Sequence, residues 1–523
     1  MTGAHSGLIR PVARSFSPAS LIVWSIAFGL AYAQAPLFAS NQNQYFLHGL
    51  ARAGFGFLGQ DWLANTVDPT PSFSLLVEGT YRLLPLGAFY LWAFLLFGVY
   101  VYSLEGLASS LFDLRDDPVK HRLFLALFVA VHAGAVRFIL LNTLGDAWAY
   151  TLEAGLAGQR LLGSVLEPSM FGVFLLLSVY LFQREKTALS VVCAVAAATM
   201  HPTYLLSAGL LTMAYTLAAV HQGDRLRAVR IPALALILVM PVLVYAVLHF
   251  ATPDPASQAQ AQEILVRSRI PHHTLIQEWW NSSALVQILI VAAGIALARK
   301  TRMFTVMVVC AGSVVVLTVI QVVTGSQALA LIFPWRPSTI LVPLGTTLVL
   351  GYVVENVWRW GGLPSDALRR RRDLLGRASI SLVLLLMLAG VAKFRIDLAQ
   401  SAAEPSRLMM AFVARSSAAG DVYMIPPYLQ DFRLTTCSPI LVDFKSIPYR
   451  AKEVIEWYDR LLLARAFYRE RAADVSCRAL RDATTRYGVN RVVLDAAQFG
   501  ASCGPWIERY RDDHYAVFEL GVE

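Results

Sequence analysis

Eleven apolar stretches separated by short loops dominate this chain of 523 residues, and its Lys and Arg residues fall mostly in alternate loops. A helix that crosses a bilayer needs about 20 apolar residues, with a range of about 17 to 25. Cytoplasmic loops are enriched in positive residues, so the alternation predicts a polytopic membrane protein with a fixed orientation. The predicted spans are residues 20–39, 83–104, 123–141, 169–182, 187–200, 203–221, 231–250, 284–298, 303–323, 338–357 and 378–392.

The composition agrees with lipid as the main solvent of this chain. Hydrophobic residues make up 56% and charged residues 15%, whereas soluble proteins carry about 25% charged residues. The net charge of +9 lies mainly in short loops beside the apolar stretches, which indicates topology rather than a nucleic-acid partner. The first apolar stretch is long for a signal peptide, so we interpret it as a retained helix.

The positions of the basic loops fix the predicted orientation. Two basic loops on the same side of the membrane must be joined by an even number of membrane crossings. The clusters predicted to be cytoplasmic are Arg184–Lys186, Arg225–Arg230, Arg299–Arg302 and Arg369–Arg377. The apolar run between the first two clusters is interrupted by His201-Pro202, and proline breaks helices, so it predicts two helices and an outer turn. The count places the N-terminus in the cytoplasm and everything after residue 392 outside it.

The predicted fold is an α-helical polytopic membrane domain, residues 1–392, followed by a small extracytoplasmic α/β domain, residues 393–523. Long outer loops are expected at 40–82, 142–168 and 251–283. The expected strands of the second domain are Val422–Ile425, Ile440–Phe444 and Val492–Leu494, and its expected helices are Ala451–Tyr468 and Ser476–Tyr487. Alternating strands and helices favour an α/β arrangement.

Three of the five cysteines lie in the predicted outer domain, at positions 437, 477 and 503. An oxidising compartment would allow one disulfide and leave one thiol over. The sequence leaves the pairing of Cys437, Cys477 and Cys503 open.

The first outer loop carries the most informative motifs. It opens with Asn41-Gln-Asn-Gln-Tyr45, and apolar residues from Phe46 to Leu58 then predict an amphipathic helix at the membrane surface. Gly59-Gln-Asp61-Trp62 and Asp68-Pro-Thr-Pro-Ser72 follow. Long, polar outer loops are where a binding site is expected.

This loop, the number of spans and the outer α/β domain resemble the GT-C class of multi-spanning glycosyltransferases. The chain also resembles an uncharacterised bacterial membrane-protein family with the same loop and a Val442-Asp-Phe-Lys445 step. The resemblance implies an enzyme of the bacterial inner membrane that transfers a sugar from a polyprenyl-phosphate donor to a glycan, lipid or protein acceptor of the envelope. It implies catalysis on the extracytoplasmic face.

The resemblance also implies the catalytic residues, with Asp61 or Asp146 as the base that accepts the acceptor proton. The chain departs from the GT-C pattern where the early acid is expected, because amides occupy positions 41–44. An amide such as Gln44 can hydrogen-bond a sugar but is not a base. Asp61 at a helix end, Asp68 in a turn and Asp146 in a solvated helix are the structural alternatives.

Further substrate-binding residues are predicted in the other outer segments. They are Asp68, His201, Tyr204, Arg267, Arg269, Trp335 and Arg336. Arginines outside the membrane run against the positive-inside trend, and arginine binds phosphate through two parallel hydrogen bonds. Snorkelling of Arg336 and a simple hairpin turn at His201-Pro202 remain the alternatives.

Two other functions stay open at this point. The amide-rich opening of the first loop favours a non-catalytic scaffold that binds a lipid-linked glycan. His132 and Arg137 within a predicted span allow a transporter, although the chain has no visible repeat. The cofactor is unknown: the resemblance allows a divalent metal, but His272 and His273 have no third ligand nearby.

Overall fold

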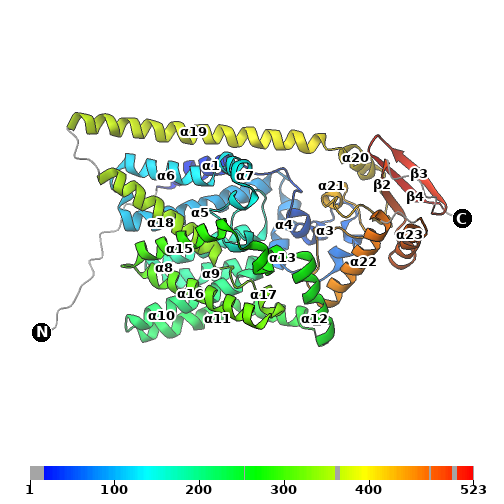
Figure 1. Ribbon diagram of the computed structural model, residues 1–523, viewed down its shortest axis with the longest axis horizontal. Coiled ribbons are helices and arrows are strands. Elements are labelled where there is room, and N and C mark those ends of the chain that lie inside the picture. Colours follow the sequence, from blue (N-terminus) through cyan, green and yellow to red (C-terminus); the bar gives the residue numbers. More distant parts are fainter. Residues whose placement is uncertain (1–16, 253, 360–364, 470–472, 497–502, 522–523) are drawn as a thin grey trace.

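The computed structural model describes residues 17–252, 254–359, 365–469, 473–496 and 503–521. Apolar helices form a bundle at one side of the molecule, and loops with a small α/β domain cover one end of it (Figure 1). Arg10 and Arg14, which precede the first predicted span, lie outside the described residues.

Each predicted span overlaps a helix, although the helix of the first span ends at Tyr32 and the third span is divided between two helices. Among the described residues, six helices are long and apolar enough to cross a membrane, and the count is seven if a pair bent by 49° forms one span. The six long helices are α5 (Ala88–Phe112), α10 (Leu205–His221, with the turn Pro202–Tyr204 before it), α11 (Arg225–Phe250), α16 (Arg302–Thr324), α18 (Ser338–Arg359) and α19 (Ser365–Ala403). The bent pair is α6 (Pro118–His132) and α7 (Gly134–Leu144), and the shorter apolar helices are α1 (Pro18–Tyr32), α8 (Val173–Gln183), α9 (Thr187–Met200) and α15 (Ser282–Ala298).

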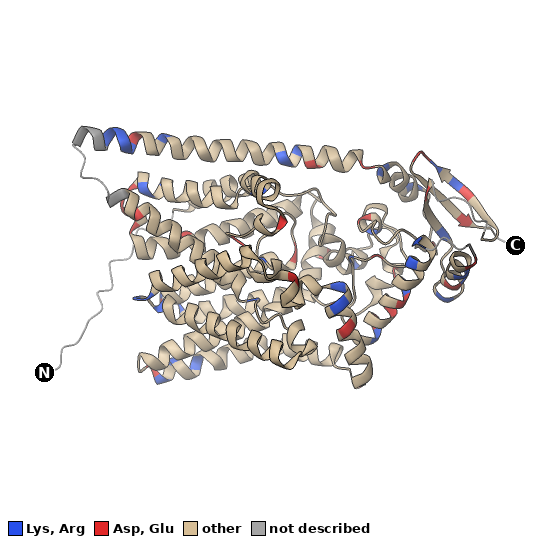
Figure 2. Cartoon of the chain, in the orientation of Figure 1, with Lys and Arg blue, Asp and Glu red and all other residues tan. Residues whose placement is uncertain are grey.

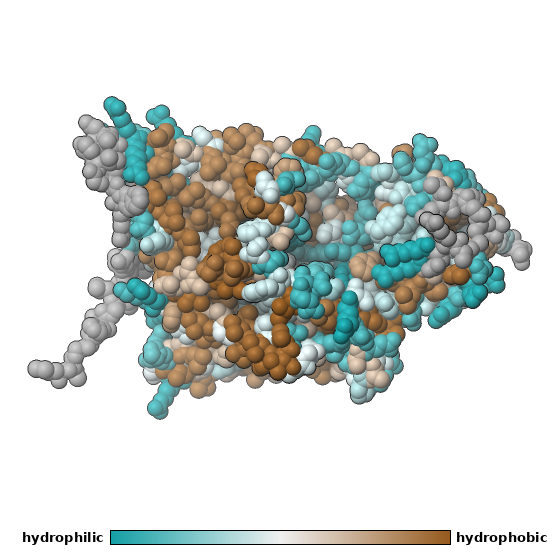
Figure 3. Space-filling view, viewed as in Figure 1, coloured by the Kyte–Doolittle hydropathy of each residue, from teal (hydrophilic) through white to brown (hydrophobic). Residues whose placement is uncertain are grey.

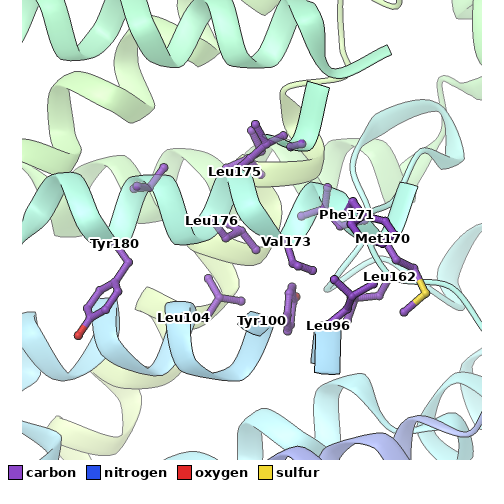
Figure 4. Close-up of a cluster of buried hydrophobic side chains, with 14 of the residues drawn as sticks. Leu96, Tyr100, Leu104, Leu162, Met170, Phe171, Val173, Leu175, Leu176 and Tyr180 are labelled. Carbon is purple, nitrogen blue, oxygen red and sulfur yellow. The ribbon is translucent and has the colours of Figure 1, made fainter. Parts of the chain in front are cut away.

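The helices have an apolar outer surface and an apolar packed interior, as expected of a membrane protein. Figure 3 shows a broad hydrophobic belt over the helical body and hydrophilic residues over the loop and α/β end. On α11, Ile237 and Leu248 are 70% and 73% exposed, which is unfavourable in water and favourable in lipid. Inside the bundle, Leu96, Tyr100 and Leu104 of α5 face Val173 and Leu176 of α8 (Figure 4).

Close helix contacts use small residues, as is usual in membrane bundles. A Cβ at Gly390 of α19 would overlap the Leu30 carbonyl of α1. Intramembrane His132 is satisfied locally, since its ring nitrogens lie 2.8 Å from the Tyr100 hydroxyl and 2.7 Å from the Phe128 carbonyl oxygen. This histidine is therefore an interior packing residue.

The basic clusters meet at the end of the bundle opposite the α/β domain, which we call the basic end (Figure 2). Arg302 pairs with Glu185 at 2.7 Å, and Arg372 pairs with Asp117 at 2.5 Å. The other end, which carries the α/β domain, is called the domain end below.

The C-terminal domain has a four-stranded sheet in the order β1-β2-β4-β3. Its elements are α20 (Ser406–Ser416), β1 (Tyr423–Met424), α21 (Phe432–Thr436), α22 (Ala451–Arg469), α23 (Ala473–Tyr487), β2 (Arg491–Asp495), β3 (Trp506–Arg511) and β4 (Tyr515–Leu520). β1 and β2 are parallel, and β4 is antiparallel to both β2 and β3. The segment predicted as strand Ile440–Phe444 forms a single bridge, Tyr423 to Ile440.

Helix α19 continues to Ala403, so the predicted domain boundary at residue 392 lies inside a helix. Helix α19 links the basic end to the C-terminal domain as one straight element (Figure 1). The predicted surface helix of the first loop is instead divided into α2 (Gln42–Tyr45) and α3 (Leu47–Arg52), and its apolar residues Phe46, Leu47, Leu50 and Leu58 are buried in the core. The amphipathic helix of this loop is α4 (Pro71–Leu83).

The loops at the domain end contain short helices that pack against the C-terminal domain. They are α12 (Pro255–Glu263), α13 (Pro271–Thr274), α14 (Ile276–Trp279) and α17 (Gln327–Leu331). Helix α12 packs on α22, and Trp62 of the first loop packs against the core of the domain. The domain is thus attached to the loops as well as to α19.

A disulfide joins Cys477 of α23 to Cys503 before β3, and Cys193, Cys310 and Cys437 are free. Protein purified without reductant and then denatured should show three reactive thiols and a peptide linking Cys477 to Cys503, by thiol counting and mass spectrometry. Five thiols, or a link that includes Cys437, would contradict this pairing.

Candidate functional site

A buried ion triad attaches the first outer loop to the C-terminal domain. The Arg433 guanidinium of α21 lies 2.9 Å from Asp61 and 2.7 Å from Asp443. Asp61 also accepts hydrogen bonds from the backbone N–H groups of Leu63 and Ile440, at 2.9 and 3.0 Å. Both oxygens of Asp61 are therefore occupied and buried, which gives this predicted base the contacts of a structural joint.

Two other residues of the first loop have structural contacts. The Gln44 amide donates to the Ile447 carbonyl at 2.7 Å and accepts from the Ile447 N–H at 2.6 Å, which pins the loop to the domain again. Asp68 accepts from the Thr70 N–H at 2.9 Å and pairs with Arg52 at 3.2 Å. The predicted sugar contact of Gln44 is thus replaced by a backbone clamp.

Beneath these joints, charged side chains from three loops and the C-terminal domain converge around Glu167. We call Arg160, Arg269, Arg336 and Lys445 the cation cluster. Arg160 and Lys445 both interact electrostatically with Glu167, and Arg269 lies near Lys445, with its guanidinium donating to the Lys445 carbonyl at 2.6 Å. Burial, Arg269 and Arg160 lower the pKa of Lys445, while Glu167 raises it. The cluster has more positive than negative charge.

Arg336 enters this region from the segment before α18, as its position in Phe333-Pro-Trp335-Arg336-Pro337 suggested. Its side chain is 8% exposed, and its guanidinium carbon lies 4.7 Å from the centre of the Tyr204 ring. The Tyr204 hydroxyl donates to the Ser169 carbonyl at 2.6 Å, and the His201 ring meets the Tyr204 ring edge-on at 5.5 Å. Burial and Arg336 lower the pKa of His201, so its imidazole is neutral. The structure thus brings His201, Tyr204 and Arg336 together, and Arg269 joins them through Tyr449, with which Arg269 and Arg336 both interact electrostatically.

Glu167 holds the second loop against the first. Its carboxylate accepts from the Asn41 amide and from the Ser169 hydroxyl, each at 2.6 Å. This contact explains the amide at position 41, because a carboxylate there would face Glu167 and repel it.

Several buried polar atoms in this region have no hydrogen-bond partner in the described protein. They are the Asn43 and Gln159 amides, Glu153 Oε2, His201 Nδ1, and the Nε atoms of Arg269 and Arg336. Buried polar groups are nearly always paired, with protein, water or ligand. Their concentration beside the cation cluster indicates a solvated or ligand-binding interior.

Glu153 is the acid of this region with the most perturbed titration. Its Oε1 lies 3.3 Å from the Arg137 guanidinium, and burial raises its pKa to about 7, against the opposing effect of Arg137 and Arg160. Its loop lies against the start of α18, since the Leu156 N–H donates to the Ser338 hydroxyl at 2.8 Å. Glu153 is therefore a buried carboxyl that can exchange a proton near neutral pH.

Three predicted site residues lie away from the cluster. Asp146 is exposed at the start of the second loop, and Arg267 is exposed on the helix that contains Ile264–Arg269. Trp335 is fully buried, packs on Trp279 and donates to the His273 carbonyl at 3.1 Å. Trp335 is therefore a core residue under the site.

Among the described residues, no group of three or more His, Cys, Asp or Glu side chains forms a metal site.

An apolar groove lies on the outside of the helical body, where several of its leucines are exposed. Its volume is about 570 Å³, and it is lined by Ser72, Leu75, Leu76, Gly79, Thr80, Leu83, Leu84, Trp92, Phe171 and Met200. Met200 precedes His201, and a Cβ at Gly172, next to Phe171, would meet the Tyr204 hydroxyl at 2.5 Å. The part of the groove lined by Phe171 and Met200 thus adjoins Gly172 and His201, both of which contact Tyr204.

Comparison with known families gives a local match in the C-terminal domain. Residues 404–464 match a family described as a domain of unknown function, DUF6798. This segment runs from α20 into α22 and contains Arg433, Asp443 and Lys445. No curated protein matches the chain.

The ion triad predicts unequal effects for the two acids that the sequence offered as bases. Asp61→Asn leaves Arg433 with one buried partner, and breaking a buried ion pair costs about 3–5 kcal/mol. We expect a lower melting temperature in detergent and faster proteolysis between α19 and α22. Asp146→Asn, at an exposed position, is the matched control and should behave like the wild type. Equal stability of both variants would argue against the triad as the joint.

The raised pKa of Glu153 predicts a pH dependence. Its folded pKa of about 7 exceeds its ordinary value of 4.5, so its contribution to stability is complete below pH 4.5 and is lost as the pH rises through 7. The wild type should lose melting temperature relative to Glu153→Gln as the pH rises from 5 to 8, because the glutamine does not titrate. The difference, variant minus wild type, should therefore increase over this range. A constant or decreasing difference would contradict the assigned environment of Glu153.

Proposed function

We propose that this protein is an integral membrane glycosyltransferase that uses a polyprenyl-phosphate sugar on the extracytoplasmic face of the bacterial inner membrane. The observation that carries the proposal is the cation cluster, with unpaired guanidinium nitrogens, together with an apolar groove whose lining residues Phe171 and Met200 adjoin residues that contact Tyr204. A lipid phosphate has the same combination of a hydrophobic tail and an anionic head.

The proposed topology has eleven crossings, the N-terminus in the cytoplasm and the domain end outside. Basic loops at the end opposite the α/β domain support this orientation. The Cys477–Cys503 disulfide also supports it, because disulfides persist outside the reducing cytoplasm.

In the proposed reaction, Arg336, Arg160 and Arg269 bind the donor phosphate by charge-assisted hydrogen bonds. The acceptor hydroxyl oxygen attacks the anomeric carbon, and the bond from that carbon to the phosphate oxygen breaks, with its electron pair leaving on the phosphate. Glu153 takes the acceptor proton. We assign this role to Glu153 rather than to Asp61 or Asp146, since its Oε2 has no protein partner and its pKa is about 7.

The second candidate is a non-catalytic protein that binds a lipid-linked glycan in envelope assembly. It is favoured by the structural contacts of Asp61 and by the Asn41–Gln44 amides that replace the early acid. Purified protein incubated with labelled polyprenyl-phosphate sugars and envelope acceptors separates the two. Transfer that is abolished in Glu153→Gln while donor binding persists supports the enzyme; binding without transfer by the wild type supports the scaffold.

Donor binding should depend on the buried arginine and not on the exposed one. Arg336→Gln removes charge-assisted hydrogen bonds, each contributing about 1.5–3 kcal/mol, so we expect polyprenyl-phosphate to bind at least about tenfold more weakly. Arg267→Gln is the matched control and should bind like the wild type. The measurement is native mass spectrometry or a fluorescent-lipid titration in detergent, and equal loss in both variants would reject the assigned site.

A further inference from the structure

A separate pocket lies on the C-terminal domain, where the two parallel strands end. Its volume is about 560 Å³, and it is lined by Pro426, Pro427, Tyr428, Phe444, Arg465, Tyr468, Arg469 and Asp495. Small-molecule sites occupy roughly 300–1,000 Å³. In α/β sheets, ligands bind in crevices outside the carboxyl ends of the strands. Pro426–Tyr428 follow β1 and Asp495 ends β2, which is that position.

The walls of the pocket are fixed by contacts across three elements. The Tyr468 hydroxyl of α22 is 2.9 Å from the Met424 carbonyl oxygen and 2.7 Å from that of Val493, which holds the helix over both strand ends. The Tyr428 hydroxyl donates to Asp495 at 3.1 Å, yet the Tyr428 side chain is 62% exposed. The strand ends and α22 thus hold the pocket walls in place, and the Tyr428 ring is exposed to solvent on one of them.

Phe444 separates this pocket from the cation cluster. Its ring centre lies 5.2 Å from the guanidinium carbon of Arg269, which belongs to the cluster, and 5.5 Å from that of Arg465, which lines the pocket. Arg465 and Arg469 are one turn apart on α22, so they lie on the same side of the helix. Two arginines against one carboxylate, Asp495, give the pocket a positive balance.

We propose that this pocket binds an acidic sugar, a pyranose ring that carries a carboxylate, as part of a glycan chain. Tyr428 supplies an open flat apolar surface for the ring, and Phe444 backs the Arg465 guanidinium. Arg465 and Arg469 match a carboxylate through paired hydrogen bonds, and Asp495 accepts hydrogen bonds from ring hydroxyls. The inference goes beyond the proposed transferase and does not depend on it, because none of these side chains belongs to the cation cluster.

The test uses the purified full-length protein in detergent and isothermal titration with tri-galacturonate, maltotriose and an acidic peptide. Tri-galacturonate should bind, with maltotriose and the peptide at least about tenfold weaker. The double variant Arg465→Gln/Arg469→Gln and, separately, Tyr428→Ala should each weaken tri-galacturonate binding by about tenfold or more. Arg478→Gln, an exposed arginine of α23, is the control and should bind normally.

Melting temperatures check that each variant is folded, and Tyr428→Ala serves as the independent variant because its ring is mostly exposed. Polyprenyl-phosphate binding should be unchanged in all variants, so failure of the acidic-sugar site and failure of the lipid-phosphate site are distinguishable. Absence of saturable tri-galacturonate binding, equal binding of maltotriose, tighter binding of the acidic peptide, or insensitivity to the pocket variants would overturn the proposal.

Discussion

The arrangement of the domain end depends on one buried guanidinium. Arg433 joins Asp61 of the first loop to Asp443 of the C-terminal domain, and each carboxylate has further hydrogen bonds from backbone N–H groups. Buried charges are tolerated only when they are paired and hydrogen-bonded. The triad therefore fixes how the segment 443–447 lies against the loops. Lys445 and the Gln44 clamp, which complete the polar interior, take their places from it.

A membrane environment gives this interior its chemical character. Apolar helices enclose the bundle, so polar side chains gather where the loops close over its domain end. There the protein collects arginines, a lysine and two buried glutamates, and Glu153, Arg269 and Arg336 each have a buried polar atom without a hydrogen-bond partner in the described chain. Burial shifts the pKa values of Glu153, His201 and Lys445 away from their ordinary ranges. An anionic headgroup whose tail lies in the adjoining groove would neutralise the excess positive charge.

The sequence predicted most of the architecture because apolar length and loop charge are local signals. The break of the apolar run at His201-Pro202 and the two helices that became α22 and α23 were also predicted, and the structure confirms them, whereas α20 and α21 were not predicted. The β3–β4 hairpin was missed: Trp506–Arg511 is mostly exposed and has no apolar run, and the short apolar run of β4 had no recognisable partner strand beside it. The continuation of α19 beyond residue 392 was missed because the apolar run ends there while the helix does not.

The site was predicted only in part, because it depends on pairs far apart in the chain. Arg336, Arg269, His201 and Tyr204 were expected from their outer positions and do converge. Glu167 and Lys445 lie 278 positions apart, and no periodicity links them. Asp61 could not be recognised as a joint, since its partner Arg433 is 372 residues away. In the second loop the sequence pointed only to Asp146, which is exposed, and not to Glu167 or Arg160, whose partners lie in other loops.

The most direct test of the account is a cryo-electron microscopy map of the protein in lipid nanodiscs with added polyprenyl phosphate. The account predicts phosphate density within hydrogen-bonding distance of Arg336 and at least one other member of the cation cluster, with the tail in the groove lined by Leu75, Phe171 and Met200. A phosphate bound elsewhere, with the cluster occupied by water alone, would contradict it.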